Sequence, residues 1–241
     1  MHLILTGATG VIGSGVLQQM IAMEGVSRIS ILSRRPVAMA EGHEEKAKVF
    51  IHKDYKNYDA TLLEQLKDAQ GCVWAQGVSQ NDVSKAEYHE ITKEYPLAAA
   101  KAFSTLHPDS PFTFVYVSGE GATQTPGMLT ALFGKVKGLA EQALIDFGKQ
   151  NPNMKVYNVR PGAVDWRAHP EIHPFLPNQP LYKRTLIPVI SMYKSLHTPT
   201  RELGKILTEL AMSKGTPLDG KDILGEGRIV PNVAIRRIAG I

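Results

Sequence analysis

The sequence predicts an α/β fold built on a doubly wound parallel sheet. Short apolar runs alternate with longer segments of helical periodicity along the chain up to Pro161. A glycine-rich turn directly follows the first of these runs. Because parallel strands require long crossover connections, this alternation places helices on both faces of one sheet.

The first three elements form a strand–helix–strand unit of the usual length. We expect them over residues 2–6, 11–24 and 28–32. The later strands are short apolar runs bounded by polar or turn residues: 48–52, 71–75, 112–117 and 155–159. The longer periodic segments between them predict helices over 61–67, 84–106 and 128–148.

The alternating pattern breaks after Pro161. Several prolines follow, so residues 164–180 are expected to form an irregular loop, of a length that often carries function. A last helix is expected to begin at Thr198, with Thr198 as its cap and Pro199 in its first position, and to end at Gly215.

Composition favours one soluble domain over residues 1–241. With 43% hydrophobic and 21% charged residues the chain can bury one sizeable core, and no repeat or linker interrupts it. The formal net charge is +4 and the basic residues are scattered, so a small anionic ligand fits better than nucleic acid.

The sequence suggests neither a secretory signal nor a membrane span. The chain starts directly with a strand and a glycine turn, which argues against a signal peptide. No run reaches the roughly 18 apolar residues of a membrane span. Cys72 is the only cysteine, so an internal disulfide is impossible. We therefore expect a cytoplasmic protein with a small-molecule substrate and no membrane partner.

The strongest chemical signal is the turn Thr6-Gly7-Ala8-Thr9-Gly10-Val11-Ile12-Gly13. It follows an apolar strand and opens a helix, which is the context of a pyrophosphate site. Gly7 permits the tight turn, Gly10 lets the backbone approach the pyrophosphate, and Gly13 lets helix and strand pack closely. The anion would sit on the helix N-terminus, where unpaired N–H groups and the dipole favour it. A purely structural glycine turn is the alternative.

Given this turn, we expect two regions with different roles within the single domain. Residues 1–162 are expected to form a dinucleotide-binding core with a Rossmann fold. Residues 163–241 are expected to supply a substrate-covering loop and C-terminal helices.

The end of the second strand indicates which dinucleotide binds. NAD-selective sites place an acidic residue here for the ribose 2′-hydroxyl, whereas this chain has Ser33-Arg34-Arg35. Two guanidinium groups suit a 2′-phosphate, so the expected cofactor is NADP(H). The alternative is that the arginines only solvate a loop. Asp54, after the third strand, is placed either to meet the adenine amino group or to cap its own loop.

The chain resembles an atypical member of the short-chain dehydrogenase/reductase superfamily. The resemblance also rests on Ala75-Gln76-Gly77, Val117-Ser118-Gly119 and Arg160-Pro161-Gly162, which follow successive strands. Lys137-Gly138-x-x-Glu141 and the Arg160-Pro161-Gly162 turn particularly resemble the NmrA-like and Tat-interacting-protein-like branch. The resemblance implies a cofactor site made of Thr6, Gly7, Thr9, Gly10, Val11, Ile12, Gly13, Arg34, Arg35, Asp54, Ala75, Gln76, Gly77, Lys137, Pro161, Gly162, Ala163 and Val164.

Reductases of this superfamily use a Tyr-x-x-x-Lys pair and a serine. The tyrosine transfers the proton, the lysine lowers the tyrosine pKa and holds the ribose, and the serine orients the carbonyl. Here Phe133 occupies the tyrosine position, and Gly119, one residue beyond Ser118, aligns with the serine. Lys137 remains, either to hold the nicotinamide ribose or as a surface lysine.

The loop after Pro161 lies where this superfamily closes over substrate. It supplies polar and aromatic candidates for substrate contact: Asp165, Trp166, Arg167, His169 and Tyr182. The candidate catalytic residues are Lys137, Ser118, Tyr182 and His169. No metal site is expected, because the prolines in the segment from His169 to His173 exclude a helical His-Glu-x-x-His motif.

These features favour an NADPH-linked oxidoreductase for a small organic carbonyl or enone, with a non-standard proton donor. Two alternatives stay open: a non-redox enzyme such as an isomerase or cyclase, and a non-catalytic NADP(H)-sensing regulator. An enclosed pocket formed by residues 164–182 would favour an enzyme, and a flat surface would favour a sensor.

Overall fold

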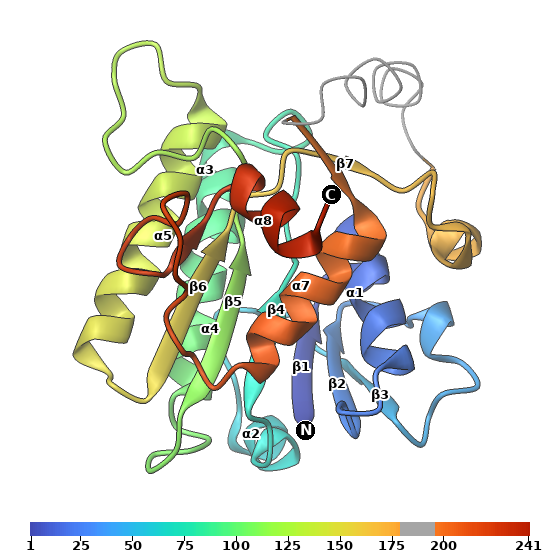
Figure 1. The fold of residues 1–241 in the computed structure, drawn as a ribbon. Coiled ribbons are helices and arrows are strands. Elements are labelled where there is room, and N and C mark those ends of the chain that lie inside the picture. The colour runs from blue at the N-terminus through green and yellow to red at the C-terminus, as the bar shows by residue number, and fades with distance from the viewer. Residues whose placement is uncertain (179–195) are drawn as a thin grey trace.

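The computed structural model describes residues 1–178 and 196–241. Its centre is a seven-stranded parallel sheet in the order β3-β2-β1-β4-β5-β6-β9, covered by helices on both faces (Figure 1). This is the doubly wound α/β architecture that the sequence predicts. No helix of the described ranges is long and apolar enough to cross a bilayer.

Every strand predicted for the sheet is present within about a residue of its expected bounds. The strands are β1 His2–Thr6, β2 Arg28–Ser33, β3 Ala47–Ile51, β4 Gly71–Trp74, β5 Phe112–Val117 and β6 Met154–Val159. Strand β9, Ile229–Val230, was not predicted, because two residues are too short a run to show a pattern. It pairs in parallel with the end of β6.

The helices divide between the two faces of the sheet. Those on one face are α1 Val11–Ala22 and α7 Thr200–Met212; those on the other are α2 Ala60–Leu66, α3 Lys85–His89, α4 Tyr95–Phe103 and α5 Leu132–Gln150. A short helix, α8 Asn232–Ala239, follows β9. Short 3-10 helices occur at η1 Ala38–Ala40 and η3 Pro170–Phe175.

The strand periodicity of two supplies each face with its own core. In β1, the side chains of Leu3 and Leu5 join the core under α1 and α7, whereas that of Ile4 joins the opposite core. The first core is mainly aliphatic, and the second is rich in aromatic side chains such as Trp74 and Phe114. Burial on both faces is what makes the central strands read as continuous apolar runs.

The long helix predicted over 84–106 is interrupted by a π-helical turn, η2 Glu90–Glu94. Pro96 has no N–H to donate to the Thr92 carbonyl four residues earlier. The Tyr116 hydroxyl donates to that carbonyl instead, at 2.9 Å. The proline thus explains both the local widening of the helix and the burial of a tyrosine hydroxyl beneath it.

Helix α5 begins later than the predicted 128–148 segment. Met128 and Leu129 supplied part of the helical pattern, but they lie on a loop and are 99% and 101% exposed. The helix starts at Leu132, and the Phe133 N–H donates to the side-chain Oε1 of Gln80, at 2.8 Å. A tertiary contact, rather than a local cap, therefore accompanies the start of the helix.

The prediction that Thr198 caps the helix now identified as α7 is wrong. Helix α7 begins at Thr200, with Pro199 in the cap position. The Thr198 hydroxyl accepts a hydrogen bond from the Gly162 N–H at 2.9 Å and donates to Asn232 Oδ1. The threonine is used to join two distant segments.

The segment after Pro161 is also more regular than predicted. The short strand β7, Ala163–Asp165, pairs in parallel with β8, His197–Pro199, and η3 follows. Residues 179 and 180 of the predicted loop lie outside the described residues.

The buried His2 should make stability fall in acid. Its Nε2 lies 2.8 Å from Ser30 Oγ, and burial lowers its pKa from 6.5 to about 4. Between these values the unfolded chain binds more protons, so stability falls as pH drops from 6.5 to about 4, by up to ~3 kcal/mol. His2→Gln should therefore lose less Tm than wild type between pH 7 and pH 4.5. The exposed His43→Gln is the matched control, and equal losses in all three proteins would contradict the assignment.

Candidate functional site

In the turn after β1, neighbouring backbone leaves no room for a side chain at Gly7 or Gly13. Gly7 has φ +73°, and a Cβ there would collide with the carbonyl oxygen of Ala75. A Cβ on Gly13 would collide with the carbonyl oxygen of Gly7. The structure therefore brings together the glycine turn, the start of α1 and the predicted Ala75-Gln76-Gly77 segment after β4.

Gly10 differs from the other two glycines of the turn. A Cβ there would meet only the Gly7 carbonyl oxygen, at 3.4 Å, so the space beside it is open. Gly10 is the cap residue of α1, and no side chain caps this helix and no acidic residue lies in its first turn. The Ser14 hydroxyl bonds the carbonyls of Ala8 and Gly10 and so fixes the turn. These features fit an anion at the helix N-terminus.

The arginines after β2 are exposed at the same edge of the sheet. The Arg35 N–H donates to the Ser33 hydroxyl, which shapes the turn, and both Arg34 and Arg35 are exposed. The arginine ion pairs within the described residues use other guanidinium groups, those of Arg160, Arg167, Arg201 and Arg237. The side chains of Arg34 and Arg35 are therefore available to a ligand.

Asp54 forms the local cap that was the alternative to an adenine contact. Its carboxylate accepts from the Lys56 N–H at 3.0 Å and from the Asn57 side-chain amide at 2.8 Å. The hydrogen bond from Asn57 lowers the pKa of Asp54. Because the two carboxylate oxygens already have these partners, the geometry favours the loop cap.

The segments after β5 and β6 run side by side. The Ser118 N–H donates to the Val159 carbonyl at 2.8 Å, and the Glu120 N–H donates to the Pro161 carbonyl at 2.9 Å. The Ser118 hydroxyl is buried and has no hydrogen-bond partner among the described residues. Beyond Pro161, the Gly162 backbone lies against Leu196, and Ala163 and Val164 enter β7.

Helix α5 is held against the loop after β5 by two glycines. A Cβ on Gly134 would lie 2.5 Å from the Gly121 carbonyl oxygen, and one on Gly138 would collide with that of Thr123. The loop therefore lies directly on the helix backbone. On the same helix, the Phe133 ring faces Gly119, where a Cβ would lie 2.8 Å from the ring Cζ.

Lys137 is anchored at the end of β5 and is half-buried, so it is not a solvated surface lysine. Its Nζ donates to the Val117 carbonyl at 2.8 Å and lies 4.8 Å from the centre of the Tyr116 ring. Burial lowers the Lys137 pKa from 10.5 to about 8, although the Glu141 carboxylate opposes this shift. The ammonium thus sits where desolvation makes its proton easier to lose.

Glu141 ties α5 to the segment after β6. Its carboxylate, which is fully buried, accepts two hydrogen bonds from Arg160, at 2.8 and 2.5 Å. Bidentate pairs of this kind fix orientation as well as distance. The Lys-Gly-x-x-Glu and Arg-Pro-Gly patterns of the sequence therefore form one connected unit in space.

Gln80 was missed in the sequence. It belongs to the segment between β4 and α3, and through Phe133 it links that segment to the first turn of α5. A single glutamine among polar residues gives no sequence signal, because its partner is 53 positions away.

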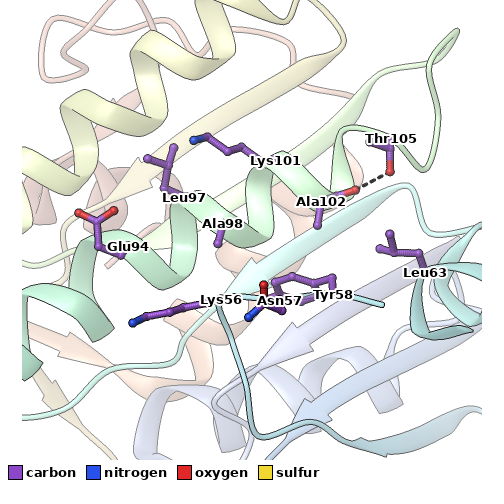
Figure 2. A pocket seen from close by; sticks show the side chains of 10 residues that line it. All are labelled: Lys56, Asn57, Tyr58, Leu63, Glu94, Leu97, Ala98, Lys101, Ala102 and Thr105. Atoms are coloured by element: carbon purple, nitrogen blue, oxygen red, sulfur yellow. Dashed lines mark hydrogen bonds between the residues drawn. The ribbon is translucent and has the colours of Figure 1, made fainter. Parts of the chain in front are cut away.

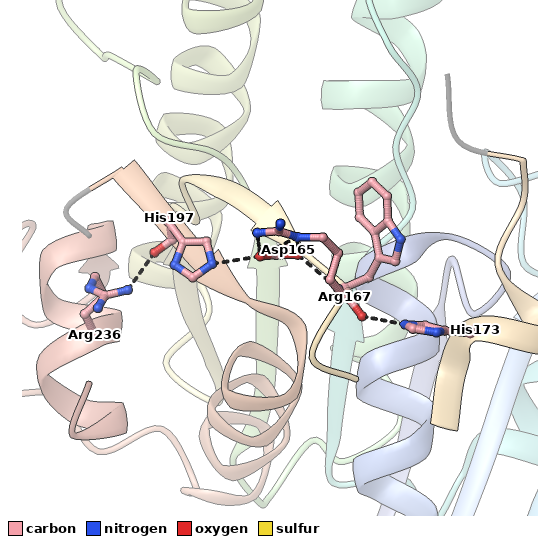
Figure 3. Close-up of polar contacts among 6 residues, drawn as sticks. Asp165, Arg167, His173, His197 and Arg236 are labelled. Atoms are coloured by element: carbon pink, nitrogen blue, oxygen red, sulfur yellow. Dashed lines mark hydrogen bonds and ion pairs between the residues drawn. The ribbon is translucent and has the colours of Figure 1, made fainter. Parts of the chain in front are cut away.

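Two of the loop candidates, Asp165 and Arg167, belong to a polar cluster with His197 and Arg236 (Figure 3). The Asp165 carboxylate accepts from Arg167 Nε and Nη2, at 3.0 and 2.8 Å, and lies 3.1 Å from His197 Nε2. Burial tends to raise the Asp165 pKa, but the hydrogen bonds from Arg167 outweigh it and the pKa is lowered. Arg236 of α8 donates to the His197 carbonyl at 2.9 Å. These bonds join β7, β8 and α8, and the sequence showed no sign of the role of His197.

His169 is packed between helices, which argues against its candidate catalytic role. It is 1% exposed, its Nδ1 lies 3.0 Å from the Thr200 hydroxyl, and its Nε2 lies 3.2 Å from Gln18 Oε1. Burial lowers its pKa. With both ring nitrogens in contact with side chains of α1 and α7, it has no free face for a substrate. Tyr182, the other loop candidate, lies outside the described residues.

A hollow on the second face of the sheet lies apart from these residues (Figure 2). Its volume is about 580 Å³, and it lies between the loop after β3 and α4, with Lys56, Tyr58 and Lys101 among its lining residues. None of the predicted site residues lines it. Within residues 1–178 and 196–241, no group of His, Cys, Asp and Glu side chains is arranged to hold a metal ion.

Comparison with known proteins identifies a relative along nearly the whole chain. The chain is 32% identical to leucinostatins biosynthesis cluster protein T of Purpureocillium lilacinum, over 98% of this chain and 94% of that protein. The chain belongs to the family of that protein. Botcinic acid biosynthesis cluster B protein 16 of Botryotinia fuckeliana is 37% identical, over 60% of this chain and 98% of that protein. No family model matches.

Solved structures with this fold include reductases and dehydratases. A short-chain dehydrogenase/reductase of Saccharomyces cerevisiae aligns with a TM-score of 0.68 and 14% identity, over 95% of this chain and 94% of that one. The KRED1-Pglu enzyme gives 0.67 and 16%, over 95% and 99%. The dTDP-glucose 4,6-dehydratase DesIV of Streptomyces venezuelae, solved with NAD bound, gives 0.65 and 15%, over 100% and 79%. The chain shares the overall fold of these enzymes.

The glycines of the turn should differ sharply in their tolerance of a methyl group. Gly13→Ala should destabilise the protein by about 3 kcal/mol, because the added Cβ collides with backbone that cannot move aside. Gly10→Ala should cost less than about 1 kcal/mol, because its space is open and its backbone is extended. Urea unfolding measures both. Similar losses for the two variants would show that the contact between Gly7 and Gly13 does not constrain the turn.

Proposed function

We propose that the protein is an NADP(H)-dependent oxidoreductase of secondary metabolism that acts on a small organic carbonyl or enone. The observation that carries the proposal is the placement of an uncapped glycine turn and a desolvated lysine at one edge of the sheet. The turn follows β1 and Lys137 lies at the end of β5, with only β4 between these strands. At about 4.8 Å per strand, the two lie within the length of a dinucleotide.

The residues present fit a dinucleotide. The uncapped N-terminus of α1 and the open side of Gly10 would receive the pyrophosphate. Arg34 and Arg35 would bind a 2′-phosphate, and Lys137 would lie beside the nicotinamide ribose. When bound, the reduced nicotinamide supplies a hydride to the substrate.

The missing proton donor sets this protein apart from ordinary reductases. The Phe133 ring contacts Gly119 and stands one helical turn before Lys137, which supports its assignment to the tyrosine position. Its ring can shape the pocket but cannot donate a proton. This absence keeps a non-redox isomerase or cyclase as the second candidate, and a cofactor-sensing regulator as a third.

The sequence relatives support a role in secondary metabolism. Both are named for biosynthesis clusters, those of leucinostatins and botcinic acid. The ion pair between Glu141 and Arg160 joins the two motifs that resemble the NmrA-like branch, and we place the protein there. The only cysteine is buried, which fits a reducing cytoplasm.

Cofactor choice should follow the arginines after β2. NADP(H) should bind at least about tenfold more tightly than NAD(H), a difference of about 1.4 kcal/mol. Arg34→Ala and Arg35→Ala should weaken NADPH binding much more than NADH binding, as measured by calorimetry. Arg28→Ala, at the opposite end of the same strand, is the matched control. Equal affinities of wild type for the two cofactors would refute the assignment.

Phe133→Tyr alone should leave NADPH consumption unchanged with a panel of ketones and aldehydes. The new hydroxyl would extend from the ring Cζ, which already faces Gly119, and would be stranded against an apolar surface. Phe147→Tyr on the same helix controls for the added hydroxyl. A rise of tenfold or more for Phe133→Tyr, or only with Gly119→Ser added, would instead indicate a standard reductase site that has lost its acid.

A further inference from the structure

We infer that Lys137 is itself the proton donor of the reaction proposed above, in place of the tyrosine hydroxyl that Phe133 lacks. The inference rests on the proposed function and assigns a catalytic role that ordinary reductases of this fold give to another side chain. It follows from the position of the Lys137 ammonium, its unused hydrogen-bond donors and the groups that surround it.

The Lys137 ammonium has more N–H donors than it uses within the described residues. An ammonium carries three N–H groups, and the Val117 carbonyl accepts one of them. No other hydrogen bond from Nζ is made to a described residue. The hydroxyl of Ser118, the residue after Val117, is buried and has no hydrogen-bond partner in the described part of the chain. Because buried polar groups are normally satisfied, this hydroxyl and the two remaining N–H groups of Lys137 indicate a place where a polar ligand atom binds.

With phenylalanine at position 133, the acidic side chain that α5 places at the end of β5 is that of Lys137. The phenyl ring lies one helical turn before Lys137, and it fills the space beside Gly119. Ser118 directly follows β5, and no basic side chain among the described residues is hydrogen-bonded to its hydroxyl. Of these two groups, the Lys137 ammonium is far more acidic than the Ser118 hydroxyl. We therefore assign the proton for a substrate oxygen bound at this strand end to Lys137.

The surroundings make the ammonium acidic without removing its charge. The titratable groups that face it are Tyr116 on β5, Glu141 on α5 and, beyond Tyr116, the buried Tyr88 on α3. The Tyr116 ring and Glu141 favour the charged form, but Arg160 already binds the Glu141 carboxylate in two hydrogen bonds. Desolvation outweighs both, and the pKa falls to about 8. A donor with a pKa near the working pH is well matched to general acid catalysis.

The step balances with one hydride and one proton. The carbonyl carbon would receive the hydride from a bound reduced dinucleotide, and the π electrons of the C=O bond would move to oxygen. An N–H bond of Lys137 breaks, the proton bonds to that oxygen and the product is an alcohol. Lys137 is left as a neutral amine, which takes its next proton from water.

Competitive labelling tests the acidity without cofactor or turnover. Trace acetic anhydride is added to the cofactor-free protein over a series of pH values, and acetylation of each lysine is quantified by mass spectrometry. Lys137 should reach half-maximal labelling near pH 8. Lys67, whose pKa is raised by its hydrogen bond to Glu64, is the internal reference and should label at higher pH. Labelling of Lys137 in parallel with Lys67 would overturn the inference.

Lys137→Arg separates proton transfer from binding. Arginine keeps the charge and the hydrogen bond but holds its proton far more tightly. NADPH affinity should stay within about threefold, whereas the reduction rate should fall by about 10² to 10⁴. Lys135→Arg on the same helix is the control and should match wild type. In wild type, kcat/KM for reduction should fall as pH rises above about 8, because the ammonium is lost.

The outcomes distinguish the two proposals. If wild type reduces a carbonyl and Lys137→Arg retains more than half of that rate, the proton comes from elsewhere and only the present inference fails. If wild type binds NADPH but reduces none of the carbonyls, the proposed function fails and this role fails with it, while the labelling curve still reports the acidity of Lys137.

Discussion

The contact between the backbone of Gly7 and that of Gly13 is the constraint on which the carboxyl edge of the sheet depends. It turns the chain from β1 into α1 with no room for a side chain at either residue. The same turn lies against Ala75, so the ends of β1 and β4 are fixed to each other. Because the strands are parallel, every later strand end is placed relative to this point.

Helix α5 places Lys137 at the end of β5 and is held by two different kinds of contact. Its glycines let the loop after β5 lie on the helix backbone, and the Glu141–Arg160 pair binds it to the segment after β6. A buried ion pair is weak support for stability, because desolvation offsets much of its attraction. Its geometric effect is clearer: it fixes the rotation of α5, and hence where the Lys137 side chain points along β5.

A proline in one helix and a lysine in another are linked through a single tyrosine. Pro96 leaves the Thr92 carbonyl without its usual donor, and the Tyr116 hydroxyl supplies the missing hydrogen bond. The ring of the same tyrosine lies under the Lys137 ammonium. The π-helical turn thus holds the Tyr116 ring in place beneath the Lys137 ammonium. In this way the packing of one helix contributes to the lowered pKa of a lysine on another.

Apolar periodicity and the glycine turn by themselves determined the layered α/β fold, the positions of the main strands and the tight turn from β1 into α1. These features are local, since a strand, a turn or a helix face is specified by residues a few positions apart. The tertiary structure alone decided which polar groups meet. Gln80 and Phe133, Thr198 and Gly162, and Asp165 and His197 are pairs of residues far apart in sequence. It also decided that the exposed Met128 and Leu129 belong to a loop, and that Lys137 is desolvated. Burial and pairing depend on what other segments place against a side chain, and no local pattern of residues contains that information.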